Sequence, residues 1–161
     1  LRALVQAARE HKRVELGYIS MKSAVAEERI IVPHTLVCTP MRWHVRAYCE
    51  KHRDYRDFVL SRFRGIPEIM DTSDHTAEQD AFWNTFINIQ IKPDGRLGEM
   101  QQEIIARDFD MTDGCLDVKT RAPLVEYMLR AFNIDPRKLE MVPEAQQIVV
   151  ANYKEIEPFL F

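Results

Sequence analysis

The strongest strand signal in this chain of 161 residues is Trp43-His44-Val45-Arg46-Ala47-Tyr48-Cys49-Glu50. Trp43, Val45, Ala47 and Cys49 would share one face of an extended strand, with His44, Arg46, Tyr48 and Glu50 on the other. A charged connection at 50–55 follows, and a second alternating run returns from it. The two runs predict a hairpin over 43–63, in which Arg62 shares a face with Arg56 and Phe58.

Shorter elements flank this hairpin. Apolar residues at helical spacing predict a helix over 1–11, and β-branched or aromatic residues predict strands at 14–20, 29–32 and 36–39. Pro33 is expected to interrupt the second of these strands, and Gly65-Ile66-Pro67 is expected to end the barrel. Several short strands at this spacing favour a small barrel or sandwich over a parallel sheet.

The second half of the chain has a different pattern, in which predicted strands alternate with predicted helices. Strands are predicted at 86–91, 115–120 and 147–150, and helices at 97–108, 122–133 and 152–160. Alternation of strand and helix over this length suggests a ferredoxin-like α+β unit. The predicted fold class is therefore mainly β followed by α+β, with domains at 1–70 (which includes the N-terminal helix) and 85–161 and a linker at 71–84.

Charge also divides the chain. Residues 1–66 hold 13 Lys and Arg against 7 Asp and Glu, a net +6, whereas residues 67–161 hold 9 against 18, a net −9. A basic first module favours an anionic partner such as a nucleotide or nucleic acid. The alternative is that scattered charges only solvate the surface. The chain starts at Leu1 inside an amphipathic pattern, so we expect a piece of a longer protein.

Signals of other protein classes are weak. Charges interrupt every apolar run, so neither a membrane span nor a signal peptide is predicted. The odd set Cys38, Cys49 and Cys115 lacks CxxC spacing, which favours a reduced cytoplasmic setting. Catalytic motifs, metal-ligand spacing of the histidines and an acid–base pair are not found, so we expect no enzyme, no metal and no cofactor.

One cluster stands out between residues 42 and 64. It holds seven basic residues against three acids, with aromatic residues interleaved. Arginine forks and aromatic faces together suit phosphate contact and base stacking. If the faces carrying Arg46 and Arg62 line one concavity, the result is a cationic pocket. The alternative is an ordinary barrel exterior with solvated arginines.

At these residues the sequence resembles the WYL domain family. The run from Trp43 to Glu50 is similar to the motif that names the family, and His44 and Val45 replace its naming Tyr and Leu. Arg29 with Pro33 and Leu36, and the run 56–63, resemble flanking family segments, although Ser61 replaces the usual Asp. Pro33-His34-Thr35-Leu36 and the Trp-His-Val variant look closest to the WYL repressors associated with phage defence.

The resemblance implies an SH3/Sm-like barrel (WYL) that senses a ligand, followed by a C-terminal extension (WCX) at about 84–161 that dimerises. It implies a bacterial transcriptional regulator, most simply a repressor at the nucleoid, whose winged helix-turn-helix lies outside this chain and binds operator DNA. The implied effector is a nucleotide or single-stranded nucleic acid. A structural oligomerisation or partner-docking module without a small ligand is the alternative. The implied ligand-binding residues are Tyr18, Ser20, His34, His44, Arg46, Phe58, Ser61, Arg62 and Arg64.

Overall fold

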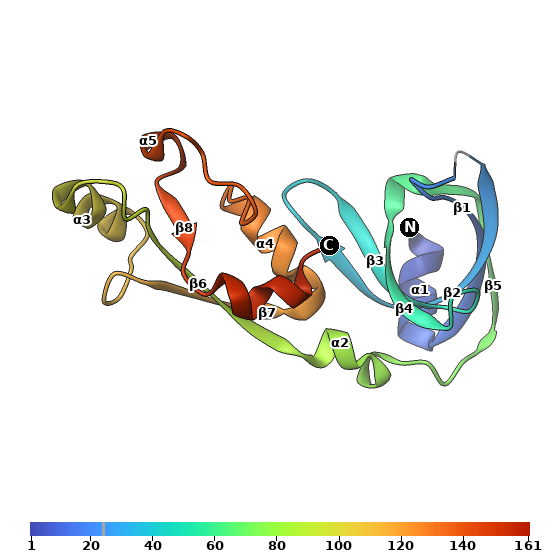
Figure 1. Ribbon diagram of the computed structural model, residues 1–161. Coiled ribbons are helices and arrows are strands. Elements are labelled where there is room, and N and C mark those ends of the chain that lie inside the picture. Colours follow the sequence, from blue (N-terminus) through green and yellow to red (C-terminus); the bar gives the residue numbers. More distant parts are fainter. Residues whose placement is uncertain (24) are drawn as a thin grey trace. The chain divides into compact units, whose positions relative to one another are not determined.

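The predicted hairpin is present in the computed structural model, which describes residues 1–23 and 25–161 (Figure 1). β3 and β4 pair antiparallel, and Cys49 faces Asp54 across the turn. The chain divides into two units, Leu1–Ala81 and Phe82–Phe161. The elements of the first unit are α1 (Arg2–Glu10), β1 (Lys12–Ile19), β2 (Ala26–Cys38), β3 (Trp43–Cys49), β4 (Asp54–Val59), the 3₁₀ turn η1 (Leu60–Arg62), β5 (Phe63–Thr72) and the 3₁₀ turn η2 (Ala77–Gln79).

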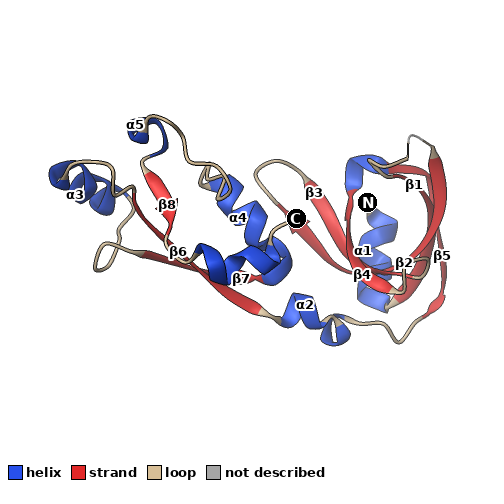
Figure 2. Ribbon diagram, viewed as in Figure 1, coloured by secondary structure: helices blue, strands red, loops and turns tan. Residues whose placement is uncertain are grey.

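The five strands of the first unit form one antiparallel sheet in the order β4-β3-β2-β1-β5 (Figure 2). Among the described residues, this order leaves β4 and β5 as the two edges, so the predicted closed barrel is not found. The result is a mainly β unit with one α-helix, and the predicted hairpin forms one side of its sheet.

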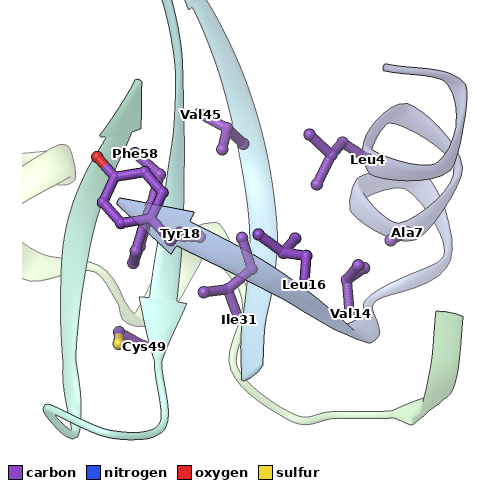
Figure 3. Close-up of a cluster of buried hydrophobic side chains, with 10 residues drawn as sticks. Leu4, Ala7, Val14, Leu16, Tyr18, Ile31, Val45, Cys49 and Phe58 are labelled. Carbon is purple, nitrogen blue, oxygen red and sulfur yellow. The ribbon is translucent and has the colours of Figure 1, made fainter. Parts of the chain in front are cut away.

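Helix α1 packs its apolar stripe against the inner face of this sheet (Figure 3). Leu4 and Ala7 of α1 join Val14 and Leu16 of β1 and Val45 of β3 in one buried cluster. The helix ends where His11 adopts a left-handed backbone (φ 49°) and its amide bonds to the Ala7 carbonyl. Each fully buried aliphatic side chain of this kind stabilises the fold by roughly 1.5–3 kcal/mol.

Two irregularities differ from the predicted strands. Pro33 does not interrupt β2, because the pairing shifts register between Pro33 and Thr35, and a bulge of this kind tolerates a residue without an amide proton. The return strand, by contrast, stops at Val59 and gives way to η1. Alternation therefore ends there, and the prediction that Arg62 shares a strand face with Phe58 was wrong.

The second unit follows the predicted order of strands and helices. Its three antiparallel strands lie in the order β7-β6-β8. The ferredoxin-like arrangement is not confirmed, since β6 pairs directly with the strand that follows α3 and the described residues supply three strands. The elements are α2 (Ala81–Asn84), β6 (Phe86–Pro93), α3 (Glu99–Asp108), β7 (Leu116–Arg121), the 3₁₀ turn η3 (Ala122–Leu124), α4 (Val125–Ala131), α5 (Pro143–Gln146), β8 (Ile148–Val150), α6 (Tyr153–Ile156) and the 3₁₀ turn η4 (Glu157–Phe159).

The core of the second unit is aliphatic. Ile89 and Ile91 of β6 are fully buried with Val125 and Leu129 of α4, and Ile156 of α6 completes the cluster. No helix among the described residues is long and apolar enough to span a membrane.

The segment predicted as a linker, 71–84, falls partly in the first unit and partly in the second. It contains the end of β5, η2 and α2, and its side chains Asp80 and Trp83 are buried. The sequence indicated a boundary here because residues 71–80 hold a single small apolar residue, Ala77. Asp80 is anchored by polar contacts, which hydrophobic periodicity does not report, whereas Trp83 is buried as an apolar side chain.

Candidate functional site

Strand β3 is buried on both of its faces. Val45, Ala47 and Cys49 point into the apolar core and have no exposed surface, as the alternation predicted. On the opposite face His44 and Arg46 are also buried, at 0% and 4% exposure. Something other than the apolar core must therefore cover and neutralise this second face, which we call the outer face.

Cross-strand register supplies the first partner on the outer face. Arg46 stands directly opposite Asp57 of β4, and its Nη1 lies 3.5 Å from Asp57 Oδ2. The same register sets Tyr48 opposite Tyr55, with ring centroids 5.3 Å apart. Directly opposed side chains on one face are the closest neighbours in an antiparallel pair.

The second partner of Arg46 comes from a distant part of the sequence. Arg46 donates from Nε to Asp80 Oδ2 at 2.7 Å and from Nη2 to Asp80 Oδ1 at 3.2 Å. This is the two-pronged geometry that matches a guanidinium to a carboxylate. The Asp80 side chain is 1% exposed, so the pair is buried.

The bulge in β2 brings His34 to the same cluster. Pro33 faces Ala47 and Thr35 faces Arg46, so His34 is the extra residue between the two pairs. A bulge redirects the side chain of its extra residue. His34 Nε2 lies 3.2 Å from Asp80 Oδ2, and its Nδ1 lies 2.8 Å from Thr35 Oγ1.

Residues 73–80, the covering segment, lie across the outer face. The His75 ring stacks on Tyr48 with centroids 3.5 Å apart and an interplanar angle of 14°. The Tyr55 hydroxyl donates to the Thr76 carbonyl at 2.9 Å. At the start of the segment, the Ser73 amide donates to the His11 carbonyl at 2.8 Å. The segment is thus held at its start, middle and end.

Burial perturbs three titratable groups here. It raises the pKa of Asp57 to about 6, against the lowering effect of Arg46. It lowers the pKa of His44 to about 4, and the charges of Arg42 and Arg46 act in the same direction. Burial also lowers the pKa of His34, although the neighbouring Asp80 opposes this shift. At neutral pH Asp57 is therefore mainly ionised beside Arg46, and both histidines are mainly neutral.

The predicted aromatic ligand residues lie on the inner face. Tyr18 and Phe58 belong to the apolar core, at 7% and 4% exposure, and their ring centroids are 5.0 Å apart. The Tyr18 hydroxyl accepts a hydrogen bond from the Val59 amide at 3.3 Å. Burial on this scale leaves neither ring face open to a base in this structure.

The remaining predicted residues lie near the end of β1 and around η1. Ser20 Oγ accepts from the Ser23 amide at 3.1 Å, and Ser61 is exposed. Arg62 ends η1 and is partly exposed, whereas the exposed Arg64 donates to the carbonyls of Ser61 and Phe63 at 2.9 and 2.7 Å. The nine predicted residues therefore fall into an outer-face group, a core group and a group around η1, with Ser20 separate just after the end of β1.

The sequence analysis did not identify the two aspartates next to Arg46, Asp57 and Asp80. Asp57 could have been found from the hairpin, because the predicted turn sets the register that places it opposite Arg46. Asp80 carries no comparable signal, because it lies 34 residues from Arg46 in a stretch without strand periodicity.

Comparison with known families identifies both units. Residues 1–67 match the WYL domain family, and residues 86–156 match the family described as BrxR transcriptional regulator, C-terminal dimerization domain. The chain is therefore a WYL domain joined to a BrxR-type dimerization domain, the composition of a WYL-domain regulator. The predicted family is confirmed.

Curated relatives give the match a more particular form. The chain is similar over 157 residues to the DNA-binding transcriptional repressor CapW of Pseudomonas aeruginosa, at 34% identity, and of Escherichia coli, at 35%. In both cases the match covers 98% of this chain and 52% of the relative, so the chain spans about half their length. Among solved structures, the chain is similar to the proteasome accessory factor PafBC of Arthrobacter aurescens, at 16% identity and a TM-score of 0.40. The match covers 98% of this chain and 25% of the PafBC chain.

Proposed function

We propose that this chain is the effector-sensing and dimerising part of a bacterial DNA-binding transcriptional repressor that serves phage defence at the nucleoid. The observation that carries the proposal is the continuous similarity to the CapW repressors, which extends through both domains. Operator DNA would be bound by a winged helix-turn-helix outside this chain. The first domain would then be of the SH3/Sm-like class, which the hairpin order and the β1–β5 pairing support.

The proposal assigns dimer formation to the second domain, in keeping with the description of its family. Sedimentation equilibrium of the purified chain should give a mass near twice the 18.9 kDa of one copy. A monomer at every concentration up to the solubility limit would contradict this assignment.

The first domain is proposed to bind a nucleotide or single-stranded nucleic acid. Arg46 on the outer face and Arg62 at the end of η1 would contact its phosphates. The support is their chemistry, because arginine forks bind phosphate in two-pronged geometry, and the basic charge of this half of the chain. His34 would join the site through Asp80, which it shares with Arg46, and His44, Ser61 and Arg64 lie within two residues of one of the two arginines. Tyr18 and Phe58 would support the site from the core.

A thermal-denaturation panel of short 5′-phosphorylated oligodeoxythymidylates and cyclic nucleotides tests this function. A ligand at a hundred times its dissociation constant should stabilise the protein by about 2.7 kcal/mol. Arg62→Ala should reduce that stabilisation, whereas Arg56→Ala, which removes an exposed charge from neighbouring β4, serves as the matched control. If no compound in the panel shifts the melting temperature, the chain is better described as an oligomerisation and partner-docking module.

A further inference from the structure

Arg46 is already occupied in this structure. Two of its three nitrogens donate to Asp80, and the third lies 3.5 Å from Asp57. A phosphate that approached the outer face would meet a guanidinium whose fork is filled by a carboxylate. It could bind Arg46 in the same geometry only by replacing that carboxylate, because one fork accepts one planar or tetrahedral anion.

We propose that Asp80 is a built-in competitor of the effector, and that a phosphate group binds Arg46 by displacing Asp80 and with it the covering segment. This inference rests on the proposed ligand-sensing function and adds its regulation. The site then has two states. In one, Asp80 pairs with Arg46 and the covering segment is bound; in the other, phosphate pairs with Arg46 and the covering segment is released. An effector favours the released state by its differential affinity for Arg46.

The energetics favour exchange of anions over simple opening. Releasing Asp80 without a replacement would leave the buried Arg46 guanidinium with Asp57 as its remaining carboxylate, so spontaneous release of Asp80 is rare. An incoming phosphate avoids this loss on the arginine side, since Arg46 stays paired. Asp57 remains opposite Arg46 throughout, because β3–β4 pairing holds it in place.

The rest of the covering segment is attached by contacts that can follow Asp80. Past Ser73, its contacts with the sheet include one ring stack on Tyr48, one hydrogen bond from Tyr55 and the contacts of Asp80. The short turn η2 immediately precedes Asp80 and depends on local bonds such as Gln79 amide to Thr76 carbonyl, 3.3 Å. In sequence, the segment lies at the end of the first unit, just before the second unit starts at Phe82.

Titration calorimetry with a short 5′-phosphorylated oligodeoxythymidylate tests the competition. Asp80→Asn keeps the shape of the side chain but removes its charge, so this variant should bind the oligonucleotide about tenfold more tightly than wild type. Asp74→Asn is the matched control, because it removes the same charge from an exposed position of the same segment. It should bind as wild type does. A parallel titration with inorganic phosphate shows whether the phosphate group alone suffices or the nucleic acid is needed.

Hydrogen exchange of the wild-type chain supplies a readout that needs no substitution. Binding of the oligonucleotide should speed amide exchange within residues 73–80, while amides of β1 and β2 stay protected and report an intact fold. Equal affinity of wild type and Asp80→Asn, or unchanged exchange of 73–80 in the bound protein, would overturn the inference and leave the proposed function standing. If none of the three proteins binds any probe, the proposed ligand sensing itself fails.

Discussion

The two faces of β3 both bury their central side chains but are stabilised in opposite ways. On the inner face Val45, Ala47 and Cys49 pack against aliphatic neighbours and need no particular partner. On the outer face Arg46 is buried only because Asp57 and Asp80 lie within reach. Apolar packing tolerates modest change, whereas a buried charge depends on a few specific contacts. The comparison predicts that substitutions on the two faces destabilise the fold by different mechanisms.

The largest effect should come from Arg46→Met. Methionine fills similar space but leaves Asp80 buried without its cation, and we expect a loss of about 3–5 kcal/mol in unfolding free energy. Urea denaturation measures this loss.

The double variant Arg46→Met/Asp80→Asn sharpens the test. It should be more stable than Arg46→Met alone, because the uncompensated carboxylate is gone. If the second substitution adds a further full loss instead, charge pairing is not what stabilises the outer face.

On the inner face, Val45→Ala should cost about 2 kcal/mol, since it removes two buried methyl groups and leaves a small cavity. The loss should be independent of pH and salt, in contrast to the outer-face variants. Denaturation at two ionic strengths checks this difference, and a clear salt dependence for Val45→Ala would contradict it.

The outer face should also show two opposing pH dependences. The pKa of His44 is lowered to about 4, so between pH 4 and 6.5 the unfolded state binds more protons and stability rises with pH. The pKa of Asp57 is raised to about 6, so below that pH the folded state binds more protons and stability falls as pH rises. Each group changes the slope by at most about 1.4 kcal/mol per pH unit.

Unfolding free energies between pH 4 and 6.5 separate the two contributions. Asp57→Asn should steepen the rise of stability with pH, whereas His44→Asn should flatten it. Slopes, rather than absolute stabilities, carry the test, because either substitution can also disturb packing. Slopes that change in the same direction would show that one of the two groups is not buried as described.

The smallest effect should come from His75→Ala, which removes the ring stacked on Tyr48. A contact of this type contributes about 0.5–1 kcal/mol. The sharper readout is amide exchange in the covering segment, which should accelerate while global stability changes little. Unchanged exchange would mean that the Asp80 contacts alone hold the segment.

The sequence predicted the inner face better than the outer one. Alternation located Val45, Ala47 and Cys49, and periodicity located the strands and helices of the second domain, because burial against an apolar core leaves a repeating signal. The bulge at His34 and the turn η1 were missed, since each depends on how neighbouring strands pair. Asp80 could not have been found, because its contact with Arg46 exists only after the chain has folded.

The proximity of Asp80 to β5 has a quantitative consequence. Only residues 73–79 separate this carboxylate from the end of β5. Asp80 therefore competes for Arg46 as a group attached to the same chain and not as a free anion. A group on so short a tether acts at an effective concentration on the order of millimolar or above. The threshold at which an anion captures Arg46 is therefore governed by the length and anchoring of this tether as well as by the pocket. Lengthening the tether would lower that threshold without touching a single contact of the arginine.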